Sequence, residues 1–120
     1  MPQVQFIHYP KCSTCRNAKK YIESKGFQVQ ERHIVDEPLN KQELRDLIAK
    51  SGLDIRKWFN TSGQKYRELG LKDKIGSMSE DELITLLVSD GMLVKRPVIR
   101  YGDRVTVGFK QEAVDQVLQA

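Results

Sequence analysis

The chain has 120 residues, of which 39% are hydrophobic and 30% charged, and these values predict one globular domain over residues 1–120 with an ordinary core. No apolar run is long enough to span a membrane, and the N-terminus lacks the apolar core of a signal peptide, so we expect a cytoplasmic protein. The net charge is +4, but the basic residues form no long stripe with aromatics among them, which argues against direct nucleic-acid binding.

The N-terminal part of the chain is predicted to form a β–α–β unit. Residues 4–9 and 27–35 have the composition of strands, and residues 14–25 have the periodicity of a helix whose apolar face includes Cys15. Gly26 follows this helix as a natural C′ residue. A strand, a helix and a strand in this order favour a parallel pair joined by a right-handed crossover.

A helical insert is predicted from about residue 37 to residue 93. Two capping boxes, Asn40 with Glu43 and Ser79 with Glu82, mark the starts of two amphipathic helices. Shorter helices are expected between them.

The C-terminal part is predicted to form a hairpin and a helix. Residues 98–101 and 104–107 flank the turn signal Gly102-Asp103, and an amphipathic helix follows from about Lys110. The order β–α–β, helical insert, β–β–α is the thioredoxin-like arrangement. We therefore expect an α/β fold with a four-stranded mixed sheet and helices on both faces.

The chain's two cysteines, Cys12 and Cys15, lie in the stretch YPKCSTCRN and are a structural disulfide, half of a metal site, or a reactive dithiol. Reducing conditions in the cytosol count against a permanent disulfide. A closed zinc site needs four ligands, and the two cysteines and two histidines do not have finger or ribbon spacing. A four-cysteine iron–sulfur cluster is excluded by count, so we expect no metal and no built-in cofactor.

Cys12 falls where a strand turns into a helix, so that free backbone N–H groups point towards its sulfur. Lys11 and Arg16 add positive charge, and a thiol in such a setting has a pKa lowered from ~8.5 to about 3.5–7.5. These features predict a redox dithiol in which Cys12 attacks and Cys15 resolves. The alternative for Cys15 is a small buried apolar residue of the core.

Three further residues are candidates for the site. His8, four residues before Cys12, either stabilises the thiolate or simply ends the strand. Pro97 opens a strand that, in a thioredoxin-like layout, begins opposite the active cysteine. Arg96 is then expected to direct its guanidinium towards the sulfur, and Pro97 to shape the substrate groove.

A family resemblance extends over nearly the whole chain. The stretches HYPKCSTCRNAKK, DEPLN, NTSGQKYRELGL, LVSDGMLVKRPVI and VTVGF resemble the arsenate reductase-like family, which also contains the Spx regulators. The chain looks closest to the small arsenate reductase-related proteins of Gram-positive bacteria. The resemblance implies a thioredoxin-like fold with a helical insert and a cis bond between Arg96 and Pro97.

In arsenate reductases of this type, a cysteine attacks arsenate, a histidine four residues earlier assists, and three arginines hold the oxyanion. The resemblance gives these roles to Cys12, to His8 and, for one of the arginines, to Arg96. Asn60, or a near neighbour, and Gly108 stand where the other two arginines are expected. The loss of two charge-assisted hydrogen bonds predicts poor arsenate reduction.

Cys15 stands where these arsenate reductases have a serine, which supports a disulfide with Cys12. The two cysteines and Arg96-Pro97 also match the Spx regulators, which use the C-x-x-C pair as a redox switch and bind the C-terminal domain of the RNA polymerase α-subunit. We therefore expect a monomeric thiol–disulfide oxidoreductase that is reduced by thioredoxin or by glutathione and glutaredoxin. A Spx-like redox-sensing regulator is the alternative, and an arsenate reductase is the third interpretation.

Overall fold

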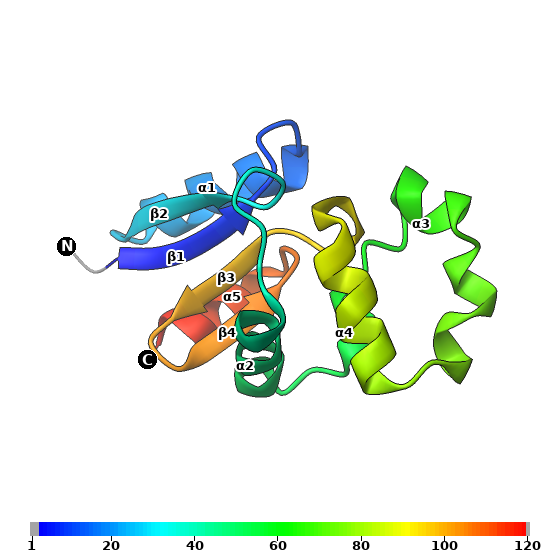
Figure 1. Ribbon diagram of the computed structural model, residues 1–120. Helices are drawn as coiled ribbons and strands as arrows, with labels where there is room; N and C mark the ends of the chain where they lie inside the picture. The colour runs from blue at the N-terminus through cyan, green and yellow to red at the C-terminus, as the bar shows by residue number, and fades with distance from the viewer. Residues whose placement is uncertain (1–2, 120) are drawn as a thin grey trace.

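The computed structural model describes residues 3–119, and within them a mixed four-stranded sheet forms the centre of the fold (Figure 1). The strands are β1 (Gln3–His8), β2 (Gln28–His33), β3 (Val98–Tyr101) and β4 (Arg104–Val107), in the spatial order β2-β1-β3-β4. β1 pairs with β2 in parallel, and β1–β3 and β3–β4 are antiparallel. This is the thioredoxin-like arrangement predicted from the sequence.

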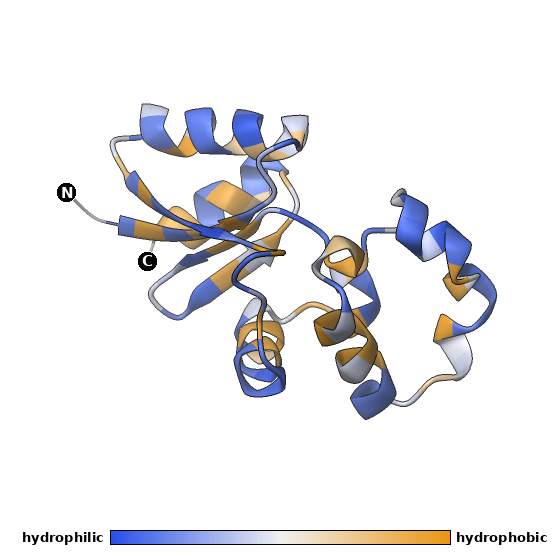
Figure 2. Ribbon diagram, turned by 45° about the horizontal axis from the view of Figure 1, so that its top comes forward, coloured by the Kyte–Doolittle hydropathy of each residue, from blue (hydrophilic) through white to orange (hydrophobic). Residues whose placement is uncertain are grey.

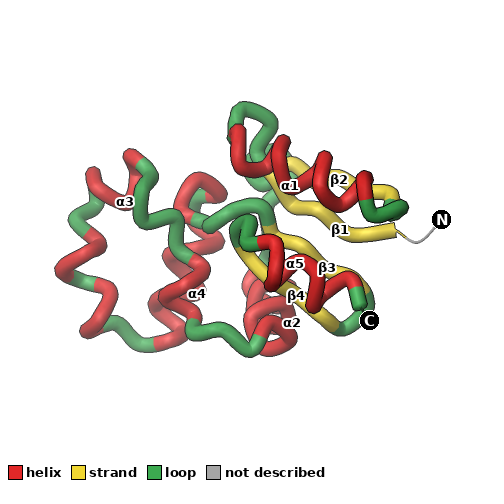
Figure 3. Tube along the Cα trace, turned by 180° about the vertical axis from the view of Figure 1, so that it is seen from behind, coloured by secondary structure: helices red, strands yellow, loops and turns green. Residues whose placement is uncertain are grey.

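Helices cover both faces of the sheet. α1 (Ser13–Ser24) and α5 (Gln111–Leu118) lie on the face seen in front in Figure 3, and α2 (Lys41–Ser51) and α4 (Glu80–Ser89) lie beyond the opposite face. α3 (Gln64–Glu68) belongs to an arm that extends away from the sheet (Figure 1). Four short 3₁₀ helices complete the insert: η1 (Ile55–Trp58), η2 (Leu71–Asp73), η3 (Ile75–Ser77) and η4 (Gly91–Leu93).

Two apolar clusters hold the layers together, because alternate strand residues point to opposite faces. Phe6 and Ile99 pack with α1 and α5, whereas Ile7 and Val98 pack with the insert. Figure 2 shows the same division on α1, whose outer side is hydrophilic and whose hydrophobic residues face the sheet. No helix within residues 3–119 combines the length and apolar character needed to cross a membrane.

Backbone pairing holds the insert beside the start of β3. Phe59 forms an isolated β-bridge with Val94, and the N–H of Lys95 donates to the carbonyl of Trp58 at 2.7 Å. The N–H of Asn60 donates to Leu93 in the same pairing. The segment that follows Trp58 is therefore brought next to Arg96-Pro97, which directly precede β3.

Local details differ from the prediction at the end of β2. The sequence predicts a strand over residues 27–35, but β2 ends at His33. The Nδ1 atom of His33 accepts the N–H groups of Val35 and Asp36, both at 3.1 Å, so the chain turns instead of continuing the ladder. The two predicted capping boxes are both present, at the starts of α2 and α4.

Candidate functional site

Cys12 is the N-cap residue of α1. Its backbone is extended, and its Sγ accepts the N–H of Cys15 at 3.3 Å, so the sulfur stands in the place of a capping oxygen. The loop before it is closed by the N–H of Cys12, which donates to the carbonyl of Tyr9 at 3.0 Å. The half-buried sulfur therefore lies at a helix N-terminus, as the sequence predicts.

The environment lowers the pKa of Cys12 below its usual value. Burial acts to raise the pKa, but hydrogen bonds from the Cys15 thiol and the Cys15 N–H favour the thiolate. The charge of Arg96 and the N–H of Thr14 act in the same direction, and together these groups outweigh burial. The site is therefore arranged to hold a thiolate at Cys12.

Cys15 has the opposite environment. Its side chain is 1% exposed and packs in the cluster between α1 and the sheet. Burial raises the pKa of Cys15 to about 12; the N–H of Tyr9 opposes this shift, and the neighbouring Cys12 adds to it. Cys15 is thus both a core residue and a neutral thiol that donates a hydrogen bond to Cys12.

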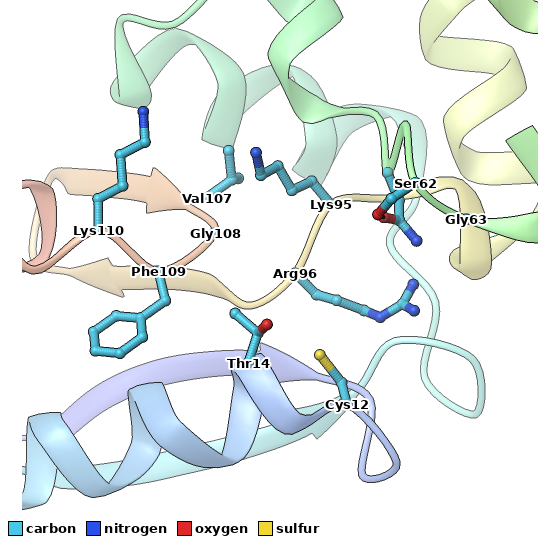
Figure 4. Close-up of a pocket in the computed structure, with 11 residues that line it drawn as sticks. Cys12, Thr14, Ser62, Gly63, Lys95, Arg96, Val107, Gly108, Phe109 and Lys110 are labelled. Atoms are coloured by element: carbon cyan, nitrogen blue, oxygen red, sulfur yellow. The ribbon is translucent and has the colours of Figure 1, made fainter.

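Arg96 is the cation that acts on both sulfurs. It precedes a cis peptide bond to Pro97, and its guanidinium lies over the ring of Tyr9 at 5.2 Å. Its Nη1 donates to the carbonyls of Met92 and Val94 at 3.3 and 3.5 Å, while Nε is buried without a partner among the described residues. Figure 4 shows Arg96 extending over the end of α1 that carries Cys12. The cis bond that the resemblance implies is present.

A pocket of about 480 Å³ opens beside the Cys12 sulfur. The residues that line it come from α1, the insert and the two ends of the hairpin: Cys12, Thr14, Asn60, Ser62, Gly63, Lys95, Arg96, Val107, Gly108, Phe109 and Lys110. Three of them are cationic and none is acidic. Asn60 and Gly108, the positions matched to the two missing arginines, therefore lie on the wall of the same pocket as Cys12.

The remaining candidates lie away from this pocket. His8 faces Glu31 at 3.5 Å, burial lowers its pKa, and no hydrogen bond joins it to Cys12 within residues 3–119. Arg16 is exposed and donates to the carbonyl of Pro10 at 3.0 Å. Lys11 is exposed and does not line the pocket.

Among the residues that the sequence candidates do not include, Lys95 and Lys110 add charge to the pocket and Tyr9 contacts Arg96. Lys95 directly precedes Arg96, and Lys110 directly precedes α5. A basic residue near each end of the hairpin is therefore the sequence feature that could have predicted a cationic pocket. Tyr9 gives no such signal, because its role depends on a cation that is distant in sequence. Within residues 3–119, no group of three or more His, Cys, Asp or Glu side chains is placed to hold a metal ion.

Comparisons with known proteins agree with this architecture. The ArsC family model matches residues 7–117. The "Uncharacterized protein YusI" of Bacillus subtilis is 56% identical over 92% of this chain and 94% of its own length. The crystal structure of a putative ArsC family related protein from Bacteroides fragilis has a TM-score of 0.91 at 43% identity and covers 95% of this chain and 96% of that one.

Two kinds of named protein occur among the more distant relatives. An arsenate reductase of Neisseria meningitidis is 29% identical over 98% of this chain and 100% of its own length. The regulatory protein MgsR of Bacillus subtilis is 26% identical over 89% of this chain and 83% of its own length. The sequence resemblance is therefore confirmed, and the chain belongs to the ArsC family.

Proposed function

We propose that the protein is a thiol–disulfide oxidoreductase that uses Cys12 as nucleophile and Cys15 as resolving thiol. The observation that carries this proposal is the Cys12–Cys15 turn, in which one sulfur accepts the other residue's N–H at 3.3 Å. The two pKa values are displaced in opposite directions, which gives the two thiols different roles.

In the proposed reaction, the Cys12 thiolate attacks one sulfur of a substrate disulfide and releases the other as a thiolate. The new mixed disulfide removes the negative charge of Cys12. Cys15 then loses its proton to the departing thiolate and attacks the Cys12 sulfur. Two electrons pass to the substrate, which leaves as two thiols, and the protein is left with a Cys12–Cys15 disulfide.

An external thiol must restore the dithiol. We propose thioredoxin, or glutathione with glutaredoxin, as the reductant, with the reducing cytosol as the compartment. The pair occupies the first turn of α1, where two residues at this spacing reach bonding distance without a large change of the backbone. Arg96 stabilises thiolate at Cys12, which favours the reduced form and makes the disulfide readily reducible.

A redox-sensing regulator is the second candidate, and the relationship to MgsR favours it. In that role the same disulfide would alter binding to a partner, such as the RNA polymerase α-subunit, rather than reduce a substrate. Arsenate reduction is a weaker candidate, because Asn60 and Gly108 supply no charge to the pocket.

Redox equilibration against glutathione tests the proposal, with thiol alkylation and mass as readouts. We expect a reversible Cys12–Cys15 disulfide, and a Cys15→Ser variant that accumulates mixed disulfides at Cys12. Cys12→Ser is the matched control and should accumulate none. A pair that never closes under mild oxidant contradicts the proposal, whereas closure without turnover of any disulfide, together with capture of the RNA polymerase α-subunit, favours the regulator.

A further inference from the structure

The part of the pocket away from α1 carries two lysines. Figure 4 shows Lys95 and Lys110 extending away from Cys12, whereas Arg96 extends over the N-terminal end of α1. Both lysines are exposed, and neither ammonium has a hydrogen-bond or ion-pair partner within residues 3–119. Their charges are therefore free to act on a molecule in the pocket.

Gly108 gives Lys95 its place in the pocket wall. Gly108 has a φ of +77°, and a Cβ built there would lie 2.8 Å from the Cε of Lys95, so any side chain at this position would displace the lysine stem. The glycine N–H donates to the carbonyl of Pro97 at 2.9 Å, which fixes this turn next to the residue that follows Arg96. Gly108, which stands where an arginine is expected, thus leaves space for the side chain of Lys95.

Acidic side chains are separated from this space. A second pocket of about 330 Å³ shares Asn60, Gly63 and Arg96 with the first and is lined by Glu68 and Asp90. Asp90 there faces Lys65 at 3.9 Å. The carboxylates therefore lie in the neighbouring pocket, and the Cys12 pocket keeps an uncompensated positive potential.

The volume of the Cys12 pocket favours a small organic molecule. Pockets of about 300–1,000 Å³ accept ligands of many atoms, and 480 Å³ falls within that range. A molecule that reaches from the Cys12 sulfur to the two lysines must carry its reactive sulfur and its negative charge at separate ends.

We propose that the substrate is a low-molecular-weight disulfide with carboxylate groups, and that Lys95 and Lys110 determine this specificity by binding a carboxylate away from the reacting sulfur. This inference rests on the proposed oxidoreductase function. Cys12 attacks the sulfur of the bound half, the other half leaves as a thiolate, and Cys15 then releases the bound half as a second thiol. An external thiol supplies the two electrons that restore the dithiol.

A set of three disulfides with different charges tests the proposal. The reduced protein is mixed with dithiodipropionate, hydroxyethyl disulfide or cystamine, which are anionic, neutral and cationic. The rate constant for Cys12–Cys15 closure is measured by acid quenching, alkylation and mass, and is divided by the rate constant of a free small thiol with the same disulfide. We expect the anion to react about tenfold faster than the cation at low salt, and the difference to shrink at about 1 M salt.

Matched lysine variants locate the effect. Lys95→Gln should slow dithiodipropionate about fivefold and leave hydroxyethyl disulfide within about twofold, and Lys110→Gln should act in the same direction. Lys20→Gln removes an equal charge from an exposed position of α1 outside the pocket and should leave the anion-to-neutral ratio unchanged.

Three results would overturn the inference while the oxidoreductase function stands. They are equal normalised rates for the anion and the cation, a Lys95→Gln variant that slows all three disulfides alike, and a Lys20→Gln variant as selective as Lys95→Gln. If none of the three disulfides closes the Cys12–Cys15 pair, the proposed function itself fails, and the inference fails with it.

Discussion

The two sides of the Cys12 pocket differ in how firmly their side chains are held. On the thiol side, formed by Cys12, Cys15 and Arg96, every functional group has contacts: an N–H on the Cys12 sulfur, a buried Cys15 thiol, and carbonyls and an aromatic ring on the guanidinium. On the lysine side, formed by Lys95, Gly108 and Lys110, the two ammonium groups are exposed and without partners in the described part of the chain.

This difference in how firmly the side chains are held matches the two proposed roles, nucleophilic chemistry on the thiol side and substrate recognition on the lysine side. Nucleophilic chemistry requires fixed sulfur, proton donor and cation, because the reacting atoms must meet in one geometry. Recognition of a small flexible anion requires charge but tolerates movement, since long lysine stems adjust to the ligand. We therefore expect changes on the thiol side to alter reactivity, and changes on the lysine side to alter the choice of substrate.

The largest expected effect separates the two cysteines. The pKa of Cys15 is about 12, and that of Cys12 lies below 9.0, so at acidic to neutral pH the thiolate fractions differ by more than about 1,000-fold. Iodoacetamide at pH 6, followed by peptide mass, should label Cys12 first, and the folded Cys12→Ser variant should label very slowly at Cys15. Preferential labelling of Cys15 would reverse the two roles.

Arsenate tests the lysine side. Only Arg96 remains of the three expected arginines, and each missing charge-assisted hydrogen bond contributes about 1.5–3 kcal/mol, so arsenate reduction should be roughly 10²- to 10⁴-fold weaker than in a three-arginine site. The measurement is arsenate turnover with thioredoxin or with glutathione and glutaredoxin as reductant. Robust turnover at sub-millimolar arsenate would show that Lys95 and Lys110 replace the missing arginines.

Asn60, Gly108 and Lys95 also show where sequence reasoning succeeds and where it stops. The family resemblance matches Asn60, or a near neighbour, and Gly108 to two arginines of the arsenate reductase site, and both residues line the pocket. Lys95 was missed because its contribution depends on a tertiary contact, the passage of its stem across the bare backbone of Gly108. Neighbours in the chain do not reveal such a contact.

The fold was predictable wherever the signal is local. Capping boxes at Asn40 and Ser79 form within one helical turn, and the sequence predicts both. Residues 71–77 form two 3₁₀ turns with no distinct periodicity, and they were not predicted. His8 was a candidate by its spacing from Cys12, but strand alternation places its side chain beside Phe6 and Glu31.

The pH dependence of stability tests the burial of Cys15. Its folded-state pKa of about 12 exceeds its usual 9.0, so its stabilising effect is complete below pH 9 and is lost as the pH rises towards 12. The lowered pKa of Cys12 acts oppositely: its contribution is present above pH 9 and is lost only when the pH falls through its folded-state pKa. Above pH 9, the loss of stability therefore comes from Cys15, because Cys12 does not destabilise the fold there.

Denaturant unfolding of the reduced protein measures this change. From pH 8 to pH 10, the Cys12→Ser variant should lose about 1.4 kcal/mol of unfolding free energy relative to the double variant Cys12→Ser/Cys15→Ala. This comparison cancels the titration of tyrosines and lysines, and Cys12 does not contribute because both variants lack it. Any constant cost of the cavity does not affect the slope. Parallel pH profiles would mean that Cys15 ionises in the fold as easily as in the unfolded chain.

The next largest expected effect is on the Cys12 pKa, and it is measured by replacing Arg96, with Arg16 as the control. Both were expected to act near Cys12, but Arg96 supplies the charge that lowers its pKa, whereas Arg16 bonds to the Pro10 carbonyl. Arg96→Gln should raise the Cys12 pKa, which slows alkylation up to about tenfold at pH values below the wild-type pKa and not at all at pH values above both pKa values. If Arg16→Gln raised the Cys12 pKa more than Arg96→Gln does, the positive charge that lowers this pKa would come from α1 and not from Arg96.

The smallest effect concerns Tyr9, which we expect to position Arg96. Its ring lies under the guanidinium at 5.2 Å and is packed edge-on by His33 at 5.6 Å between centroids. The Tyr9 carbonyl accepts the N–H of Cys12, and the Tyr9 N–H acts on the Cys15 sulfur. Substitutions of the Tyr9 side chain leave these backbone interactions in place. A cation–π contact contributes about 0.5–2 kcal/mol, so Tyr9→Leu should loosen Arg96, raise the Cys12 pKa and slow alkylation at pH 6 about two- to threefold.

Tyr9→Phe is the control, because it keeps the aromatic face and loses only the hydroxyl. A full pH profile of alkylation distinguishes positioning from general damage, since only a shifted pKa leaves the plateau rate at high pH unchanged. In Arg96→Gln, the same Tyr9→Leu change should have no further effect on the Cys12 pKa, because the cation that the ring holds is gone. If Tyr9→Leu behaves as the wild type does, the carbonyls of Met92 and Val94 are sufficient to hold Arg96, and the aromatic ring serves packing alone.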